Sequence, residues 1–436
     1  MNMIRLKEWV KKAPPFGYLV CLLLVWMVGI PLPSYAQRIA LPGFSRNIPN
    51  PFVLSNGSTV TSPEQWYSER RPEMLHLFTT QMYGRSPGRP PYMRFHVFEN
   101  DPRALDGMAT RRQVTVFFNG KKGGPRMDIL IYLPNAVKRP APLFVGLNFE
   151  GNQSIALDTA IRVTTSWEYG GNRGVVAHHA TGAGRGSAAV RWPLKMILKR
   201  GYGIATIYAG DIAPDKMDGK MTGVQSIYPL LQRGGDNFAT LSAWAWGLSR
   251  AMDYFGTDSD IDADRVAVFG WSRMGKAALW AGAQDRRFAM IISNESGAGG
   301  AKLFHHFSGE NIHRLCTKFP YWFCRNFQQY IGNDTTLPFD QHELMALIAP
   351  RPLYIASAEE DENSDPYGEF LTALAVDTVY RFLGLQGLPV KTMPAVNHPV
   401  FGRISYHIRG GEHNITPYDW RQYLHFADMF LKNEGG

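Results

Sequence analysis

Cysteine is scarce in this chain, whose 436 residues include only three. Cys21 lies in an N-terminal apolar run, which leaves Cys316 and Cys324 in "CTKFPYWFC". In an oxidising compartment a disulfide between these two is plausible, and two free buried thiols are the alternative. The histidines of segment 305–313 have no cysteine or carboxylate nearby that completes a zinc spacing. We therefore expect no metal and no other cofactor.

Long apolar runs are also few. The N-terminal run, from about residue 17 to residue 30, is shorter than the ~20 residues that a membrane-spanning helix needs. Basic residues precede it and "SYA" follows it, an order typical of a secretory signal cleaved after Ala36, and no lipobox surrounds Cys21. We expect residues 1–36 to be a signal peptide and the mature protein to be secreted or periplasmic, with no membrane attachment after cleavage. A single transmembrane anchor is the alternative.

The mature chain, residues 37–436, shows no repeat, no low-complexity linker and no change of composition, so we expect one large domain. Loss of the signal segment removes four basic residues and one acidic residue, which lowers the formal net charge from +9 to +6. Lysine and arginine are scattered and no RNA- or DNA-binding module is legible, which argues against nucleic acid as a partner. The modest basic excess suits an acidic ligand.

Apolar, β-rich runs alternate with helix-like segments along the chain. Continuous apolarity indicates strands that are buried on both faces, and strands alternating with helices predict a mostly parallel sheet covered on both sides. The segment Asn237 to Phe255 carries an apolar stripe at helical spacing. Ligands of such sheets bind at the carboxyl ends of the strands. The predicted strands cover residues 114–118, 127–133, 143–148, 202–208, 266–270, 290–294 and 353–357.

A candidate nucleophile follows one of these strands, in "VAVFGWSRMGK". Ser272 stands between an apolar run and a good helix former, which is the order of a nucleophile elbow. The usual pattern G-x-S-x-G is altered, however, because Met274 occupies the second glycine position and the glycine comes one residue later, at Gly275. The placement favours Ser272 as a nucleophile over a structural serine.

A serine nucleophile needs a base and an acid, and the residues alone leave both open. His398, His407 and His413 all lie near the C-terminal end of the predicted sheet. Glu295 and Asp361 each follow a strand, and the later position, Asp361, is the usual one for a hydrolase acid.

The chain resembles carbohydrate esterase family 15, the glucuronoyl esterases, and their bacterial branch above all. The resemblance rests on "GWSRMGKAALWAGAQDRRFAMIISNESGAGGA", "ASAEEDENSDPYGEF" and "YHIRGGEHNITPYDW", and it extends over nearly all of the mature chain. The family signature G-C-S-R-x-G-K has the same late glycine, and Trp271 replaces its cysteine. The resemblance implies an α/β-hydrolase fold, a three-layer αβα sandwich.

The resemblance also implies roles for individual residues. Ser272 matches the nucleophile and His413 the base. Glu295 matches the acid of the fungal members and Asp361 a second acid of the bacterial ones, with preference for Glu295 because its motif is shared more widely. Arg273 matches a side chain that helps to hold the oxyanion. Contacts with the sugar hydroxyls are implied for Lys276 and, less closely matched, Glu310, whereas Asn363 stands where relatives often have an aromatic wall.

The function implied is that of a secreted, cofactor-free serine esterase. Its substrates would be esters between (4-O-methyl-)glucuronoyl groups of xylan and lignin-type alcohols, cleaved through a glucuronoyl-enzyme, and we expect a monomer. One alternative is an acetyl xylan esterase or general carboxylesterase on the same fold. Another is an inactive hydrolase-fold protein that only binds acidic polysaccharide.

Overall fold

The computed structural model describes residues 38–41 and 47–432. The predicted signal segment, residues 1–36, lies outside these described residues. Within them, no helix is long and apolar enough to span a bilayer.

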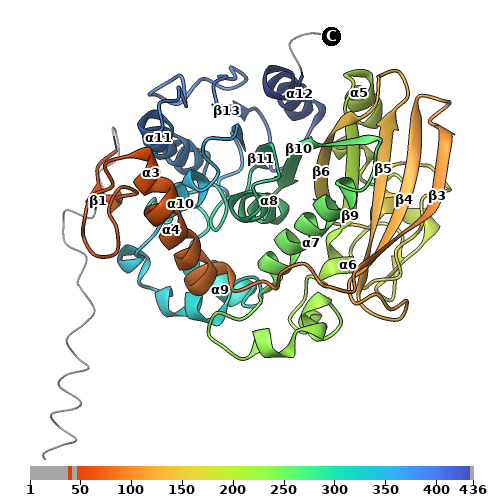
Figure 1. Cartoon of the computed structure of the whole chain (residues 1–436), viewed down its shortest axis with the longest axis horizontal. Coiled ribbons are helices and arrows are strands. Elements are labelled where there is room, and N and C mark those ends of the chain that lie inside the picture. Colours follow the sequence, from red (N-terminus) through yellow and green to blue (C-terminus); the bar gives the residue numbers. More distant parts are fainter. Residues whose placement is uncertain (1–37, 42–46, 433–436) are drawn as a thin grey trace, which may run out of the picture.

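A nine-stranded sheet runs through the molecule (Figure 1). In spatial order its strands are β13 (Ile404–Arg409), β12 (Leu353–Ala358), β11 (Met290–Asn294), β10 (Ile261–Trp271), β6 (Ala141–Asn148), β9 (Gly203–Tyr208), β5 (Arg126–Pro134), β4 (Ala109–Phe117) and β3 (Arg94–Ala104). The six strands from β13 to β9 are parallel to one another, whereas the β9–β5, β5–β4 and β4–β3 pairs are antiparallel. Two short pairs stand apart from the sheet, β1 (Arg38–Ile39) with β2 (Ile48–Pro49) and β7 (Val175–Val176) with β8 (His179–Ala180).

Helices cover both faces of the sheet. They are α3 (Pro63–Gln65), α4 (Arg71–Phe78), α5 (Leu194–Lys199), α6 (Ala209–Ile212), α7 (Thr240–Phe255), α8 (Arg273–Gln284), α9 (Ile312–Lys318), α10 (Gln341–Ala346), α11 (Pro366–Phe382) and α12 (Pro417–Leu431). The larger core contains residues of α4, α7, α8, α10 and α11, and the smaller core contains residues of α5 and α12.

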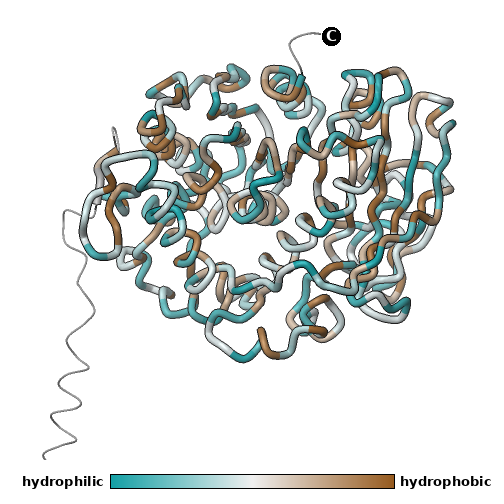
Figure 2. Tube along the Cα trace, in the orientation of Figure 1, coloured by the Kyte–Doolittle hydropathy of each residue, from teal (hydrophilic) through white to brown (hydrophobic). Residues whose placement is uncertain are grey.

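Successive strand residues divide between these two cores. In β10, Val266 and Val268 belong to the larger core, whereas Ala267 and Phe269 belong to the smaller one. This period of two is what a sheet buried on both faces requires, and Figure 2 shows hydrophobic residues gathered along the central strands. The predicted three-layer αβα arrangement is confirmed.

The seven predicted strands are all present, with differences in detail. Segments 114–118 and 127–133 fall in or beside β4 and β5, which are antiparallel, while the rest of the predicted set is parallel. The predicted helix begins at Thr240 and not at Asn237, and nearly all of its residues are buried instead of one stripe.

Cys316 and Cys324 are free, buried thiols in this structure, so of the two alternatives that the sequence offers the disulfide is absent. Cys316 lies on α9, and Cys324 directs its Sγ to the carbonyl oxygen of Thr80. Burial raises the pKa of Cys316 to about 12 and that of Cys324 to about 11. Both thiols therefore stay protonated at neutral pH.

Candidate active site

Ser272 is held on a strained turn between β10 and α8. Its backbone has φ 57° and ψ −132°, a region that L residues rarely occupy. The N–H of Ser272 donates to the carbonyl oxygen of Asn294 at the end of the neighbouring strand β11. The serine therefore stands at the carboxyl edge of the sheet, where sites of this fold class form.

The unusual glycine spacing has a steric reason. A Cβ atom on Gly270 would lie 2.1 Å from the carbonyl oxygen of Met274, and one on Gly275 would lie 2.9 Å from the Cβ of Ser296. Both positions thus need glycine because the strand end, the first turn of α8 and the loop after β11 approach closely. The side chain of Met274 is buried in the core and needs no such clearance. The turn therefore keeps the geometry of a nucleophile elbow although its second glycine is shifted by one residue.

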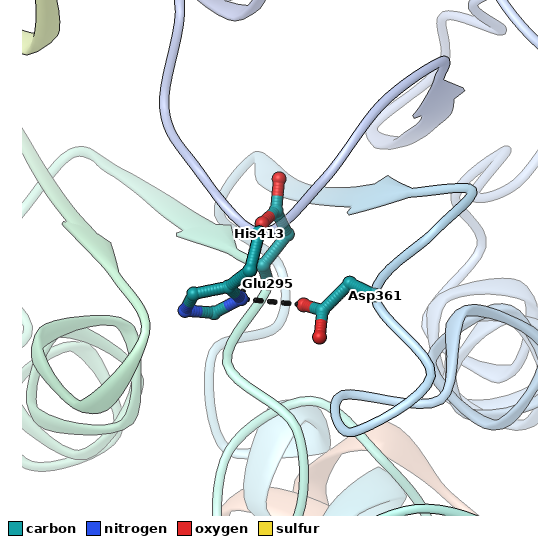
Figure 3. A group of neighbouring side chains, drawn as sticks. All are labelled: Glu295, Asp361 and His413. Carbon is teal, nitrogen blue, oxygen red and sulfur yellow. Dashed lines mark hydrogen bonds and ion pairs between the residues drawn. The ribbon is translucent and has the colours of Figure 1, made fainter.

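His413 faces two carboxylates (Figure 3). Its Nδ1 makes a 2.5 Å hydrogen bond with Oδ2 of Asp361 and lies 3.2 Å from Oε2 of Glu295. Glu295 follows β11, Asp361 follows β12 and His413 follows β13. The three side chains therefore come from the ends of three adjacent strands. Nε2 of His413 has no hydrogen-bond partner among the described residues.

The charges of this group support one another. Burial raises the pKa of Glu295 to about 7, although the bond with His413 acts in the opposite direction. Burial also disfavours the charged form of Asp361, but the bond and charge of His413 outweigh it and the pKa lies below its usual value. Burial alone would lower the pKa of His413, and the two carboxylates reverse this and raise it to about 9. The site therefore stabilises an imidazolium, which is the charge that a general base acquires.

Glu295 has further partners that sequence reasoning missed. Its Oε1 accepts from Nη2 of Arg409 at 2.7 Å, and its Oε2 accepts from the backbone N–H of Asn414 at 2.8 Å. Arg409 also donates to the carbonyl oxygens of Glu412 and Asn414, which flank His413 in the chain. The pair Glu295–Arg409 thus fixes the loop that carries His413. The only signal in the sequence was the place of Arg409, four residues before the histidine.

The other two candidate histidines have different surroundings. His407 is buried in β13, where Nε2 meets Asp419 at 2.9 Å and Nδ1 meets the hydroxyl of Tyr354. His398 is exposed, and its Nδ1 bonds the carbonyl oxygen of Val396. Neither lies beside an acid pair, so of the three histidines only His413 has the surroundings of a catalytic base.

Trp271 joins the elbow to the histidine. Its ring centroid lies 5.1 Å from that of His413 and 5.1 Å from that of Phe149. The guanidinium of Arg191 lies over the Trp271 ring, 4.6 Å from its centroid. The residue that departs from the family signature therefore packs directly against the imidazole and restricts its orientation.

Arg273 begins α8 and borders a cavity of about 370 Å³. Its Nη1 donates to Oδ2 of Asp215 at 2.7 Å, and its guanidinium lies over the rings of Phe149 and Trp322. The first turn of a helix leaves N–H groups without an intrahelical acceptor, here those of Arg273 and Met274. Backbone donors and a cationic side chain therefore lie together next to Ser272.

Lys276 is a buried residue, not a solvated helix lysine. Its Nζ donates to the carbonyl oxygens of Ser296 and Ala298, both at 2.6 Å, and to Oε2 of Glu310 at 3.1 Å. An ammonium has three donors, and these contacts occupy all of them. The structure thus brings Lys276 and Glu310 together as an ion pair, and their contact with a sugar stays a prediction.

Asn363 stands at the position where the family resemblance implies an aromatic side chain. Its side-chain oxygen accepts from Arg314, and its backbone oxygen accepts from the N–H of Glu310. Asn363 therefore ties down the segment that carries Glu310.

Glu295, Asp361 and His413 offer ligand atoms within 4.8 Å of one another, the spacing of a metal site. In this structure, however, Nδ1 and Oδ2 are in direct contact at 2.5 Å. Two ligands that each lie about 2.0–2.1 Å from one zinc ion in tetrahedral geometry are farther apart than that. The arrangement fits a hydrogen-bonded acid–histidine group better than a set of metal ligands.

Two of the three histidines of segment 305–313 form separate pairs with carboxylates. His305 bonds Asp340 at 2.7 Å, and His306 contacts Asp365. Over residues 38–41 and 47–432, neither belongs to a second group with the spacing of metal ligands.

Comparison with known proteins places these residues in a family context. A family model described as "Glucuronyl esterase, fungi" matches residues 150–384, more than half of the chain. The structure of a promiscuous CE15 esterase from a marine bacterial metagenome is 45% identical with a TM-score of 0.83, covering 91% of this chain and 98% of that one. A glucuronoyl esterase from Solibacter usitatus is 42% identical with a TM-score of 0.84, covering 89% and 99%. The 4-O-methyl-glucuronoyl methylesterase 1 of Wolfiporia cocos is 28% identical over 82% of this chain and 77% of its own length.

Proposed function

The chain belongs to the glucuronoyl esterase family, and from this premise we propose that it is a secreted serine esterase acting on esters of glucuronoyl groups. Its relatives include a 4-O-methyl-glucuronoyl methylesterase, a carboxylic ester hydrolase by name. The proposed substrate is the ester between a (4-O-methyl-)glucuronoyl side group of xylan and a lignin-type alcohol. No cofactor enters the proposed reaction.

In the proposed mechanism, Ser272 is the nucleophile and His413 the base. Nε2 of His413 takes the proton of Ser272 Oγ while Oγ attacks the ester carbonyl, and the carbonyl electrons move to the oxygen. Collapse of this tetrahedral intermediate breaks the bond to the alcohol, which leaves with the proton from His413. Water activated by the same imidazole then cleaves the glucuronoyl-enzyme. Asp361 and Glu295 stabilise the imidazolium in both steps.

Arg273 is proposed to stabilise the negative oxygen of the tetrahedral intermediate. It lies directly after Ser272 at the N-terminus of α8, so its charge adds to that of the first backbone N–H groups. One donor of this kind is worth ~3 to 4 kcal/mol of transition-state stabilisation. Lys276 and Glu310 are proposed to form the sugar side of the site, with Glu310, the less buried partner, accepting from ring hydroxyls.

The proposal also covers secretion, domain organisation and oligomeric state. Residues 1–36 would direct secretion, and residues 37–436 would form one catalytic domain that acts as a monomer. Amino-terminal sequencing of the secreted protein, expressed from its full gene, should begin at Gln37. A retained N-terminus would contradict the signal assignment.

The observation that carries the proposal is the His413 group: Nδ1 is held by carboxylates, Nε2 is free of partners among the described residues, and the ring packs on the residue before Ser272. The test is hydrolysis of benzyl glucuronate by wild type and by Ser272→Ala, beside p-nitrophenyl acetate and an acetylated xyloside. We expect kcat/KM to be highest for benzyl glucuronate and to vanish with Ser272→Ala. Hydrolysis of the acetyl esters alone would contradict the glucuronoyl assignment.

A broader esterase is the second candidate, and one similarity favours it. The marine metagenome esterase that shares 45% of its sequence is described as promiscuous. If this chain shares that property, kcat/KM for the acetylated xyloside should come within about tenfold of that for benzyl glucuronate, a difference of about 1.4 kcal/mol in transition-state binding.

A further inference from the structure

The carboxylate of Asp215 is bound by three donors. Oδ2 accepts from Nη1 of Arg273 at 2.7 Å, while Oδ1 accepts from the hydroxyl of Tyr321 at 3.0 Å and from Nε1 of Trp322 at 2.7 Å. Asp215 follows α6 and the tyrosine–tryptophan pair follows α9, so two segments far apart in the chain meet at the start of α8. A carboxylate fixed at both oxygens has one orientation, and it passes that orientation to the arginine.

The guanidinium of Arg273 has few other restraints. It lies 5.1 Å from the ring centroid of Phe149 and 5.4 Å from that of Trp322. Its Nε is buried without a hydrogen-bond partner among the described residues. Among those residues the only ion pair of Arg273 is the one with Asp215, so this pair decides where the guanidinium points along the cavity wall.

We propose that Asp215 is a positioning residue for the esterase reaction, which holds Arg273 ready for the oxyanion. The inference rests on the proposed function, in which Arg273 stabilises the tetrahedral intermediate. An arginine side chain has many rotamers, and a donor contributes most to catalysis when it need not reorganise as the charge develops. Nη1 is anchored to Asp215, and the N–H groups of Nη2 are left for the substrate.

The charge of Asp215 acts against this benefit, because a carboxylate beside a developing oxyanion repels it. Three observations limit that cost. Both carboxylate oxygens accept hydrogen bonds, one donor is itself cationic, and the side chain is 23% exposed, so water screens it. Preorganisation therefore outweighs repulsion, and loss of Asp215 slows the reaction.

A purely structural role is the competing explanation, since Asp215 also ties its own segment to Tyr321 and Trp322. A double-mutant cycle separates the two. If Asp215 acts through Arg273, the substitution Asp215→Ala costs much in the wild-type background and little when Arg273 is already alanine. If it only maintains the fold, it costs the same in both backgrounds.

The experiment measures kcat and KM on benzyl glucuronate for Asp215→Ala, Arg273→Ala and the double variant. Misplacement of a catalytic group by about 1 Å costs on the order of 100-fold. We therefore expect Asp215→Ala to lower kcat by about 10- to 100-fold with KM changed less than about threefold. In the Arg273→Ala background the same change should lower kcat less than about threefold. Equal losses in the two backgrounds would overturn the inference.

Asp428 on α12 provides the matched control. It too accepts from an arginine and a tyrosine hydroxyl, Arg200 at 2.6 Å and Tyr202 at 3.0 Å. Asp428→Ala should leave kcat unchanged, and Asp215→Glu should recover part of the lost rate because it restores the ion pair. A lack of any recovery by glutamate, together with a fall in melting temperature as large as that of alanine, would favour the structural explanation and overturn the inference.

A crystal structure of Asp215→Asn tests the inference without any activity. The amide keeps the shape and loses the charge, so we expect the Arg273 guanidinium to leave its position over the rings of Phe149 and Trp322. An unmoved guanidinium overturns the inference. A wild-type enzyme that fails to cleave benzyl glucuronate contradicts the proposed function instead, and the crystal structure still decides whether Asp215 positions Arg273.

Discussion

The two carboxylates at His413 are not equivalent, and this can be measured. Asp361 makes the 2.5 Å bond with Nδ1, whereas Glu295 lies at 3.2 Å and shares its charge with Arg409 and the N–H of Asn414. The geometry thus favours Asp361 as the principal acid, against the preference for Glu295 that came from its shared motif. We expect Asp361→Asn to lower kcat more than Glu295→Gln does.

The size of each loss follows from what remains. With Asp361→Asn, the Glu295 carboxylate still faces Nδ1, so we expect a loss of about 10²- to 10³-fold rather than the ~10⁴-fold of a triad without its acid. With Glu295→Gln the strong bond to Asp361 persists, and a loss of about tenfold is expected. The double variant should approach ~10⁴-fold. The assay is kcat on benzyl glucuronate, with melting temperature as a control for folding.

The same variants should shift the pH profile in a defined direction. The base must be neutral, and the carboxylates raise the pKa of His413 to about 9 against the effect of burial. Wild-type kcat/KM should therefore rise with pH and level off only near pH 9. Removal of Asp361 removes a cause of the raised pKa, so the rising limb should move to lower pH. A limb that stays in place, or a Glu295→Gln variant as slow as the double variant, would refute this division of roles.

Three further predictions concern the frame of the site. Gly270→Ala should abolish folding or activity, because its Cβ would meet a backbone oxygen at 2.1 Å, whereas the matched Gly88→Ala, with nothing within 4 Å, should behave as wild type in both assays. Lys276→Met should lower the melting temperature, since it leaves two buried carbonyls unpaired at about 1–3 kcal/mol each; an unchanged value would mean that water replaces the ammonium. Burial raises the pKa of Glu369 to about 8 from 4.5, so its stabilising contribution is full below pH 4.5 and is lost as pH rises to about 8. Glu369→Gln should therefore gain stability relative to wild type across that window in urea titrations, and a constant difference would contradict the assignment.

Much of the fold was readable in the sequence because burial on both faces leaves continuous apolar runs. The strands that were missed lack this signal. β3 reads "RFHVFENDPRA" at the exposed edge of the sheet, where polar side chains face solvent. β13 is buried, but it contains His407 and Arg409, which are tolerated there because both pair with Asp419. A single sequence does not show such pairing, because the partner of these two side chains comes from another element of the fold.

The residues of the candidate site also fall into two groups, those that the local sequence identifies and those that only the fold identifies. The elbow was readable because Ser272 and its glycines are local in the chain. The choice among three histidines, and between Glu295 and Asp361, depended on which loops meet at the sheet edge. Asp215 carried no local signal, because its role arises from donors about sixty and a hundred residues away in the chain.

The central claim is that Ser272 attacks the glucuronoyl ester, and covalent labelling tests it most directly. The wild-type enzyme would be treated with a serine-reactive phosphonate, its peptides analysed by mass spectrometry and its residual hydrolysis of benzyl glucuronate measured. We predict one phosphonyl group per chain, located on Ser272, with activity lost in proportion to labelling. Complete labelling of Ser272 with activity retained, or complete inactivation with Ser272 unmodified, would contradict the claim.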